Sequence, residues 1–202
     1  SMKKSGEPGI IFSDDKHFTC DSCAATEYIY PNDESDDYSS RTYYEEGKVT
    51  YSNEYERDAN GRTTKQTRKD ANGKVTYVYE YKYDDAGNQT YSKTTYYDED
   101  GEVTSANATE YDYDGAGNCT EERRYTTANG KLRLNRKVVY IIENDVVTSG
   151  YIYRYIYSGE NVTERVNTKQ TFTYDTNGNV TLNMVYSPEF ADDYSVKAWK
   201  EN

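Results

Sequence analysis

Residues 70–90 read DANGKVTYVYEYKYDDAGNQT, two copies of one short pattern on either side of a run of alternating tyrosines. Each copy starts with an aspartate and reaches a glycine three positions later, at Gly73 and at Gly87. This spacing favours a type I turn that ends on a left-handed glycine and closes a β-hairpin through a bulge. Between the turns, Tyr77, Tyr79 and Tyr81 occupy every second position, so their side chains share one face of the predicted strand.

The same pattern, or a weaker form of it, recurs along most of the chain. Its copies are 44–50, 58–61, 70–76, 84–90, 98–104, 114–120, 127–130 and 175–181, with degenerate forms near 144–145 and 158–159. Self-similarity of this kind indicates one structural unit used repeatedly. Ten turns joining eleven strands predict an all-β fold, an antiparallel meander of about eleven strands in a single curled or spiralling sheet.

The positions two, four and six residues after each turn glycine are predicted to share one face of the sheet. Apolar side chains occupy many of them, such as Tyr51 and Leu134. Charged side chains, among them Lys65, Arg123 and Arg136, fall on the same positions. We therefore expect this face to be only partly buried, with long charged side chains lying over aromatic rings.

The two ends of the chain differ from the repeats and divide it into three parts. Residues 1–40 are expected to be mostly irregular, with an acidic loop at 33–37 and one short strand near Tyr28–Tyr30. Residues 41–186 form the repeat domain, and 187–202 form a C-terminal tail. Ser187 followed by Pro188 resembles a helix start, so a short helix from Pro188 to Trp199 is predicted, covering a sheet edge.

The composition excludes several classes of partner. Aliphatic residues are scarce, and 25 tyrosines supply the apolar area in a chain of net charge −12. An acidic chain without basic clusters is a poor ligand for nucleic acid or anionic lipid, and no stretch is apolar enough for membrane insertion. A protein or a glycan is the expected partner.

Metal, cofactor and catalytic chemistry have little support in the sequence. His17, Cys20 and Cys23 resemble part of a zinc site, but a structural zinc ion needs four ligands and Cys119 is the only other cysteine. A disulfide or free thiols at Cys20 and Cys23 are favoured over zinc or a redox pair. The acidic turn at 98–101 is explained by turn chemistry rather than by calcium. With one histidine and no phosphate-binding loop, we predict no metal, no cofactor and no enzyme activity.

Three segments resemble the tyrosine–aspartate (YD, or RHS-type) repeat, whose core is Tyr-x-Tyr-Asp-x-x-Gly-Asn/Arg. They are 81–88, 111–118 and 172–179, and the resemblance extends over about 41–186. The chain is similar to short YD-repeat proteins that bacteria carry on their surface or secrete. This resemblance implies a β-meander and an extracellular or cell-surface location. Larger members enclose a toxin in a shell of such repeats, whereas this chain is too short for a shell and has no evident toxin domain.

The predicted function is that of a non-enzymatic bacterial surface or secreted module, an interaction or adhesion scaffold. The alternative is a carbohydrate-binding module that stacks tyrosines on a cell-wall or host glycan. In both hypotheses the contact residues are tyrosines that alternate along two strands: Tyr77, Tyr79, Tyr81, Tyr151, Tyr153, Tyr155 and Tyr157. These rings either form the core of the sheet or remain open as a binding platform.

Overall fold

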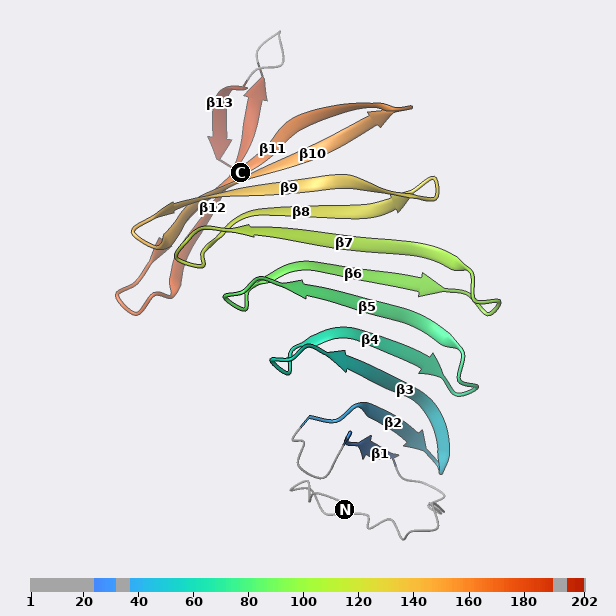
Figure 1. Ribbon diagram of the computed structural model, residues 1–202. Helices are drawn as coiled ribbons and strands as arrows, with labels where there is room; N and C mark the ends of the chain where they lie inside the picture. Colours follow the sequence, from blue (N-terminus) through green and yellow to red (C-terminus); the bar gives the residue numbers. More distant parts are fainter. Residues whose placement is uncertain (1–23, 32–36, 191–195, 202) are drawn as a thin grey trace. The chain divides into compact units, whose positions relative to one another are not determined.

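The computed structural model describes residues 24–31, 37–190 and 196–201, and these residues form one antiparallel meander (Figure 1). Thirteen strands follow one another in the sheet in the order in which they occur in the chain, from β1 to β13. No helix occurs in the described residues. The predicted all-β antiparallel meander is therefore confirmed, with two strands more than the repeat count indicates.

The strands lengthen toward the C-terminal half of the chain. Their bounds are β1 Ala24–Ile29, β2 Ser40–Glu45, β3 Lys48–Arg57, β4 Thr63–Asp70, β5 Val75–Tyr83, β6 Gln89–Tyr97, β7 Val103–Tyr113, β8 Cys119–Ala128, β9 Lys131–Glu143, β10 Val146–Ser158, β11 Asn161–Tyr174, β12 Val180–Phe190 and β13 Val196–Glu201. The chain divides into two compact units. The first comprises the residues up to Tyr81 with Thr94–Thr104, and the second comprises Lys82–Lys93 with the residues from Ser105 onward.

Six of the ten turns between β2 and β12 follow the Asp-x-x-Gly pattern. In each, hydrogen bonds of the aspartate hold the turn closed. In the turn at 70–73, the Gly73 amide donates to the Asp70 carbonyl at 3.1 Å, and the Asp70 amide donates to the Lys74 carbonyl at 2.8 Å. The Asp70 carboxylate accepts from the amides of Asn72 and Lys74 at 2.8 and 2.9 Å. Gly73 has φ +80°, the left-handed conformation predicted for it. The equivalent turns begin at Asp58, Asp84, Asp98, Asp114 and Asp175.

The other four turns are two-residue loops, a different class from the one predicted. Glu46 and Gly47 both have positive φ, as a type I′ turn requires, and so do the residue pairs 129–130 and 144–145. In the fourth loop Gly159 has φ +63°, between the paired residues Ser158 and Asn161. The prediction of a single turn type is therefore wrong at these four places. The loop at each of these four places has two residues, fewer than the Asp-x-x-Gly turns. In so short a loop, type I′ and II′ turns match the twist of the two strands, whereas type I and II turns would splay them.

We expect Gly73→Val to lower the free energy of unfolding by at least about 1 kcal/mol, because a β-branched residue is strained at positive φ. A β-carbon added at Gly73 has no atom within 4 Å, so the whole effect would come from the backbone. Thr76→Val, three residues after Gly73 in β5, should be neutral or stabilising, because valine favours strands. Urea denaturation of the two variants tests this, and equal losses would contradict the turn assignment.

The C-terminal part of the chain corrects the predicted helix from Pro188 to Trp199. Pro188 lies in β12 and pairs with Trp199 of β13. The pairing of β12 with β11 begins only at Tyr186, so the missing N–H of Pro188 removes no hydrogen bond on that side. At the other end, the short strand expected near Tyr28 is β1. The acidic loop residues 33–36 and the cysteines Cys20 and Cys23 lie outside the described residues.

Burial is shallow throughout the described residues. The buried apolar side chains are Ala106, Ala108 and Val138, and the buried polar residues are Asn53, Thr95 and Glu122. No large side chain among them falls below 2 % exposure. Most tyrosines are half-buried, so they form neither a closed core nor a fully exposed platform.

β-bulges overturn the prediction that the same positions after each turn share one face. Lys65 pairs with Glu56 and lies on the face opposite Tyr51. In β9, Leu134 is opposite Tyr125 but Arg136 is opposite Arg124, because the register shifts between these two residues of β8. One extra residue on a strand reverses the face of every side chain beyond it.

Candidate binding faces

Tyr77, Tyr79 and Tyr81 lie along one face of β5, as the alternation predicts. The ring centroids of Tyr77 and Tyr79 are 5.0 Å apart with the planes at 65°, and those of Tyr79 and Tyr81 are 6.2 Å apart and stacked. Tyr96 of β6 approaches Tyr77 edge-on at 6.3 Å. All three predicted tyrosines are half-buried, so each keeps part of its surface accessible while neighbouring rings pack against it.

Arginines separate the tyrosines of this face across β3, β4 and β5. The Arg68 guanidinium lies 3.7 Å from the ring centre of Tyr51 and 5.4 Å from that of Tyr77. It also donates to the Tyr77 hydroxyl at 3.0 Å. A guanidinium over an aromatic face is attracted by the ring quadrupole. We call this surface the tyrosine–arginine face of the first unit.

The same alternation continues toward β2. Arg41 lies 4.7 Å from the ring centre of Tyr43, and Arg57 lies 5.8 Å from that of Tyr55. The Nε atoms of both arginines are buried without a hydrogen-bond partner. Burial raises the pKa of Tyr43 to about 12, against the opposing effect of Arg41, and burial also raises the pKa of Tyr55. These phenols therefore stay neutral at physiological pH and remain hydrogen-bond donors.

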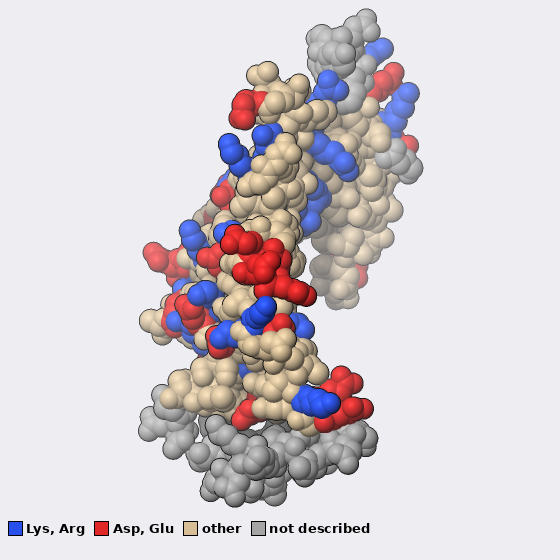
Figure 2. Space-filling model, turned by 90° about the vertical axis from the view of Figure 1, so that its right-hand side faces the viewer, with Lys and Arg blue, Asp and Glu red and all other residues tan. Residues whose placement is uncertain are grey.

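The opposite face of the same strands is charged. Lys69 pairs with Glu54 at 2.5 Å and Lys65 with Glu56 at 2.7 Å. Figure 2 shows basic and acidic side chains next to each other over much of the surface in view. A hollow of about 620 Å³ on this unit is lined by Lys65, Lys74, Val78, Glu80, Tyr97 and the turn at 98–101, among others. Its lining mixes both signs of charge and has no arrangement typical of a catalytic site.

The second predicted set, Tyr151, Tyr153, Tyr155 and Tyr157, also lies on one face, along β10. We call it the tyrosine row. Tyr151 contacts Trp199 of β13 at 5.9 Å between ring centres, and the ammonium of Lys137 lies 4.7 Å from the ring centre of Tyr153. Tyr157 is 36 % exposed, and the other three are half-buried. Each of the two sets thus lies on one face of its strand, as the alternation in the sequence predicts.

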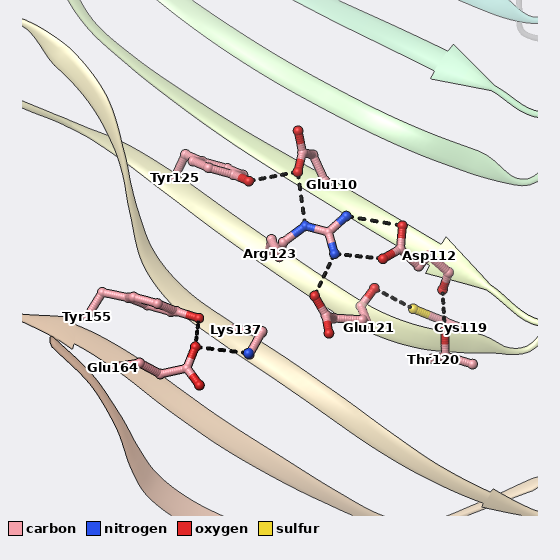
Figure 3. Close-up of polar contacts among 10 residues, drawn as sticks. All are labelled: Glu110, Asp112, Cys119, Thr120, Glu121, Arg123, Tyr125, Lys137, Tyr155 and Glu164. Atoms are coloured by element: carbon pink, nitrogen blue, oxygen red, sulfur yellow. Dashed lines mark hydrogen bonds and ion pairs between the residues drawn. The ribbon is translucent and has the colours of Figure 1, made fainter. Parts of the chain in front are cut away.

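Two hydroxyl groups of the tyrosine row, those of Tyr155 and Tyr157, bind partners within the chain. Tyr155 donates to the Glu164 carboxylate, which also accepts from Lys137 at 2.9 Å (Figure 3). Tyr157 donates to the Leu134 carbonyl at 2.8 Å. At Tyr155 and Tyr157 the hydroxyl groups are therefore occupied, and the part of these residues that remains for a ligand is the ring.

A polar network centred on Arg123, which no sequence pattern predicts, lies on the same face of the sheet as the tyrosine row (Figure 3). Its guanidinium binds Glu110 at 3.0 Å and Asp112 at 2.6 Å, and it also pairs with Glu121. Tyr125 donates to Glu110 at 2.7 Å. Three acidic residues on two adjacent strands share one cation, so this network stabilises the pairing of β7 with β8.

The network shifts the pKa values of its members. The hydrogen bond from Tyr125, and then those from Arg123, lower the pKa of Glu110, and the hydrogen bond from Arg123 lowers that of Asp112. Burial raises the pKa of Tyr125 to about 12. The carboxylates are therefore held ionised, which is the state for ion pairing and not that of a general acid.

Cys119 lines another hollow, which is in the second unit. This space of about 330 Å³ in the second unit is lined by Tyr111, Tyr113, Asn118, Cys119, Glu122, Tyr140 and Val147. Cys119 is a free thiol, and burial raises its pKa, which makes it less reactive. The described residues contain no group of three or more His, Cys, Asp or Glu side chains placed to hold a metal ion. They also contain no helix that is long and apolar enough to cross a membrane.

Comparisons with known proteins give no assignment. The sequence matches no protein-family profile and no curated protein sequence. Among solved structures it is similar to TcdB2-TccC3-Cdc42, with 15 % identity and a TM-score of 0.36 over 87 % of this chain and 12 % of that chain. It is also similar to TcdB2-TccC3 without its hypervariable C-terminal region, with 15 % identity and a TM-score of 0.36 over 83 % of this chain and 10 % of that chain. The chain thus spans about a tenth of the length of either solved chain, and a TM-score of this size says nothing about what it binds.

Proposed function

We propose that this chain is a non-enzymatic interaction module of a bacterial cell surface or secretion, which binds a protein partner through its tyrosine-rich faces. The bacterial and extracellular part of the proposal rests on the resemblance of 81–88, 111–118 and 172–179 to the YD repeat. The interaction part rests on the arrangement of the tyrosines. Tyrosine is favoured at interfaces because it has a large apolar ring and a polar tip.

The observation that carries the proposal is the partial exposure of the tyrosine row. Tyr151, Tyr153, Tyr155 and Tyr157 lie at alternate positions of one long strand. Lys137 contacts the ring of Tyr153, and a hydrogen bond to the Leu134 carbonyl fixes the hydroxyl of Tyr157. Such pre-ordered rings lose little conformational entropy on binding. A long, regular sheet face suits an extended partner better than a small molecule, which needs a concave pocket.

The proposed absence of catalysis rests on chemistry rather than on the comparisons. The acidic groups with shifted pKa values are held ionised by arginine, lysine, tyrosine or turn amides. In the hollow that contains Cys119, burial and the carboxylate of Glu122 both raise the pKa of the thiol, which is the opposite of what activates a cysteine nucleophile. A hydrolytic activity that co-purifies with the protein and disappears on a single carboxylate substitution would overturn this part of the proposal.

The proposed function can be tested with immobilised proteins and neutral polysaccharides as probes. Wild type, Tyr153→Ser and the control Tyr97→Ser, whose ring lines the charged hollow, would be measured on collagen, fibrinogen, cellulose and chitin. We expect binding to at least one protein surface that Tyr153→Ser weakens and Tyr97→Ser leaves unchanged. Binding to cellulose or chitin alone would favour the carbohydrate-binding alternative. Binding to none, or equal losses in both variants, would contradict the role of the row.

Truncation of one ring separates a packing role from a binding role. We expect Tyr153→Ala to lower the free energy of unfolding by about 1.5 kcal/mol, less than the ~3–5 kcal/mol for a buried aromatic residue, because the ring is only half-buried. Thermal or urea unfolding measures this value. A loss above about 3 kcal/mol would show that the row is core rather than surface.

A further inference from the structure

Two arginines of the tyrosine–arginine face each lie against one ring of a tyrosine pair. The rings of Tyr43 and Tyr51, which are directly opposite each other on β2 and β3, have centres 4.1 Å apart. The guanidinium of Arg41 lies 4.7 Å from the ring centre of Tyr43, and that of Arg68 lies 3.7 Å from the ring centre of Tyr51. Arg41 and Arg68 flank Asn53 across β2, β3 and β4, so their Cα atoms are about 10 Å apart.

Neither of these two arginines forms an ion pair with any of the described residues. Arg41 lies against two tyrosine rings, and its Nε atom is buried without a hydrogen-bond partner. Arg68 lies against two rings and donates one hydrogen bond, to the Tyr77 hydroxyl at 3.0 Å. A half-buried guanidinium without a carboxylate is unusual, because desolvating a charge is costly unless it is paired. Contacts with the rings offset part of that cost and leave both groups able to bind an anion.

The positions around the two arginines offer no carboxylate that is free to pair with them. Besides the arginines, the residues directly opposite one another on this face of β2 to β5 are tyrosines, an asparagine, a glutamine and Asp70. The Asp70 carboxylate already accepts hydrogen bonds from two amides of its own turn. Arg57, a third arginine of this face, pairs with Asp37 at 3.8 Å and so has its own counter-ion. The charges of Arg41 and Arg68 are therefore not balanced on this face, although the chain as a whole is acidic.

The two faces of these strands differ in the way that distinguishes a protein interface from ordinary surface. Interface cores are enriched in tyrosine and arginine and depleted in lysine, glutamate and aspartate. The residues that contribute most to binding energy at interfaces favour tyrosine and arginine as well. The tyrosine–arginine face has this composition, whereas the opposite face carries the ion pairs of Lys65 with Glu56 and of Lys69 with Glu54. The tyrosine–arginine face is therefore the side of the first unit that fits a protein partner.

We propose that the tyrosine–arginine face of the first unit binds an acidic segment of a protein, in which isolated carboxylates stand among apolar or aromatic side chains. This inference rests on the proposed function, in which the partner is a protein, and adds the charge of the partner at this face. A carboxylate of the partner pairs with the guanidinium of Arg41 or Arg68 through two parallel hydrogen bonds. Its apolar groups pack on the half-buried rings of Tyr43 and Tyr51. Because ring contacts already position both guanidinium groups, little conformational entropy is lost on binding.

A densely charged polymer fits this face less well than an acidic protein segment does. Nucleic acid carries closely spaced charges, and the proteins that bind it use clustered lysines and arginines along its path. Here the two unpaired guanidinium groups are separated by Asn53, which is 2 % exposed, and tyrosine rings surround them. The negative charge elsewhere on the chain is screened beyond ~8 Å at physiological ionic strength, so it does not prevent local pairing with a carboxylate.

A fluorescently labelled random copolymer of glutamate, alanine and tyrosine is the probe, and the same copolymer with amidated carboxylates is the uncharged control ligand. We expect wild type to bind the acidic copolymer, to bind it more weakly as sodium chloride is raised, and not to bind the amidated one. Arg68→Gln and Arg41→Gln should each weaken binding at least about fivefold, because each removes charge-assisted hydrogen bonds. Arg68→Lys should also weaken it, since lysine keeps the charge but not the two-pronged geometry. Urea denaturation checks that each variant is folded, and the two arginine positions provide independent tests.

Two control variants separate this proposal from general electrostatics and from the role of the tyrosine row. Lys69→Gln removes the same charge from the position next to Arg68, on the opposite face of β4, and Tyr153→Ser alters the tyrosine row; both should bind the acidic copolymer as wild type does. Failure of wild type to bind this copolymer would overturn the proposal, and so would equal binding of the amidated copolymer or an equal loss in Lys69→Gln. Heparin or single-stranded DNA that binds as tightly as the copolymer would overturn it in favour of a general polyanion site. The proposed function is judged by Tyr153→Ser on protein surfaces, so either proposal can fail while the other stands.

Discussion

Arg123→Met is expected to lower the free energy of unfolding by about 2.5 kcal/mol at pH 7, since removing one partner of a fully buried ion pair costs ~3–5 kcal/mol. We expect less than the full cost because the side chains of Arg123 and Glu121 are 24 % and 26 % exposed and that of Asp112 is 53 % exposed. The variant leaves Glu110, Asp112 and Glu121 facing one another without a cation. Urea denaturation at pH 7 measures the loss.

The effect of Arg123→Met should depend on pH in a defined direction. The folded-state pKa values of Glu110 and Asp112 are lowered, so their stabilising contribution is present above the unfolded values of ~4 and is lost as the pH falls through the lower folded values. The difference between wild type and variant should therefore narrow toward pH 2–3. A difference that stays constant with pH would show that Arg123 acts by packing and not by charge.

Lys65→Met is the matched control for charge removal. Lys65 and Glu56 form an ion pair whose side chains are 41 % and 66 % exposed, and such surface pairs contribute ~0–1 kcal/mol. We expect Lys65→Met, which removes this ion pair, to change the free energy of unfolding by less than about 0.5 kcal/mol. A loss as large as that of Arg123→Met would mean that the Arg123 network is no different from a surface pair.

Val138→Ala is expected to lower the free energy of unfolding by about 2 kcal/mol, although it removes only two methyl groups' worth of apolar surface. Val138 is 2 % exposed, the lowest value of the described apolar residues. A β-carbon added at Gly150 of β10 would lie 3.7 Å from its Cγ1, so the side chain packs over the glycine. Val162 in β11 is 53 % exposed, so Val162→Ala should cost less than about 0.5 kcal/mol. Chemical denaturation of both variants measures the contrast, and equal small losses would show that this sheet has no packing centre at Val138.

The turns and the strand alternation are the features that the sequence alone determined. Asp70 and Gly73 build their turn from contacts within five residues, so no distant part of the chain is needed to define it. Alternation along one strand is equally local, which is why Tyr77, Tyr79 and Tyr81 were correctly placed on one face, as was the tyrosine row. The predicted binding role of these tyrosines remains a proposal, because it depends on a partner.

Three features were decided only by the tertiary structure, and all three depend on the pairing of distant segments. Pro188 belongs to a strand rather than a helix because β13 pairs with the part of β12 that lies beyond its last pair with β11, Tyr186 with Lys169. Arg136 lies opposite Arg124 because a bulge shifts the register of β8 and β9 by one residue. Arg124, Arg136, Arg154 and Arg165 lie opposite one another across β8 to β11 because of three such registers, while the sequence has no basic run longer than two residues there. Local patterns predict turns and faces, but register is set by interactions across strands, so surfaces that span several strands appear only in the folded chain.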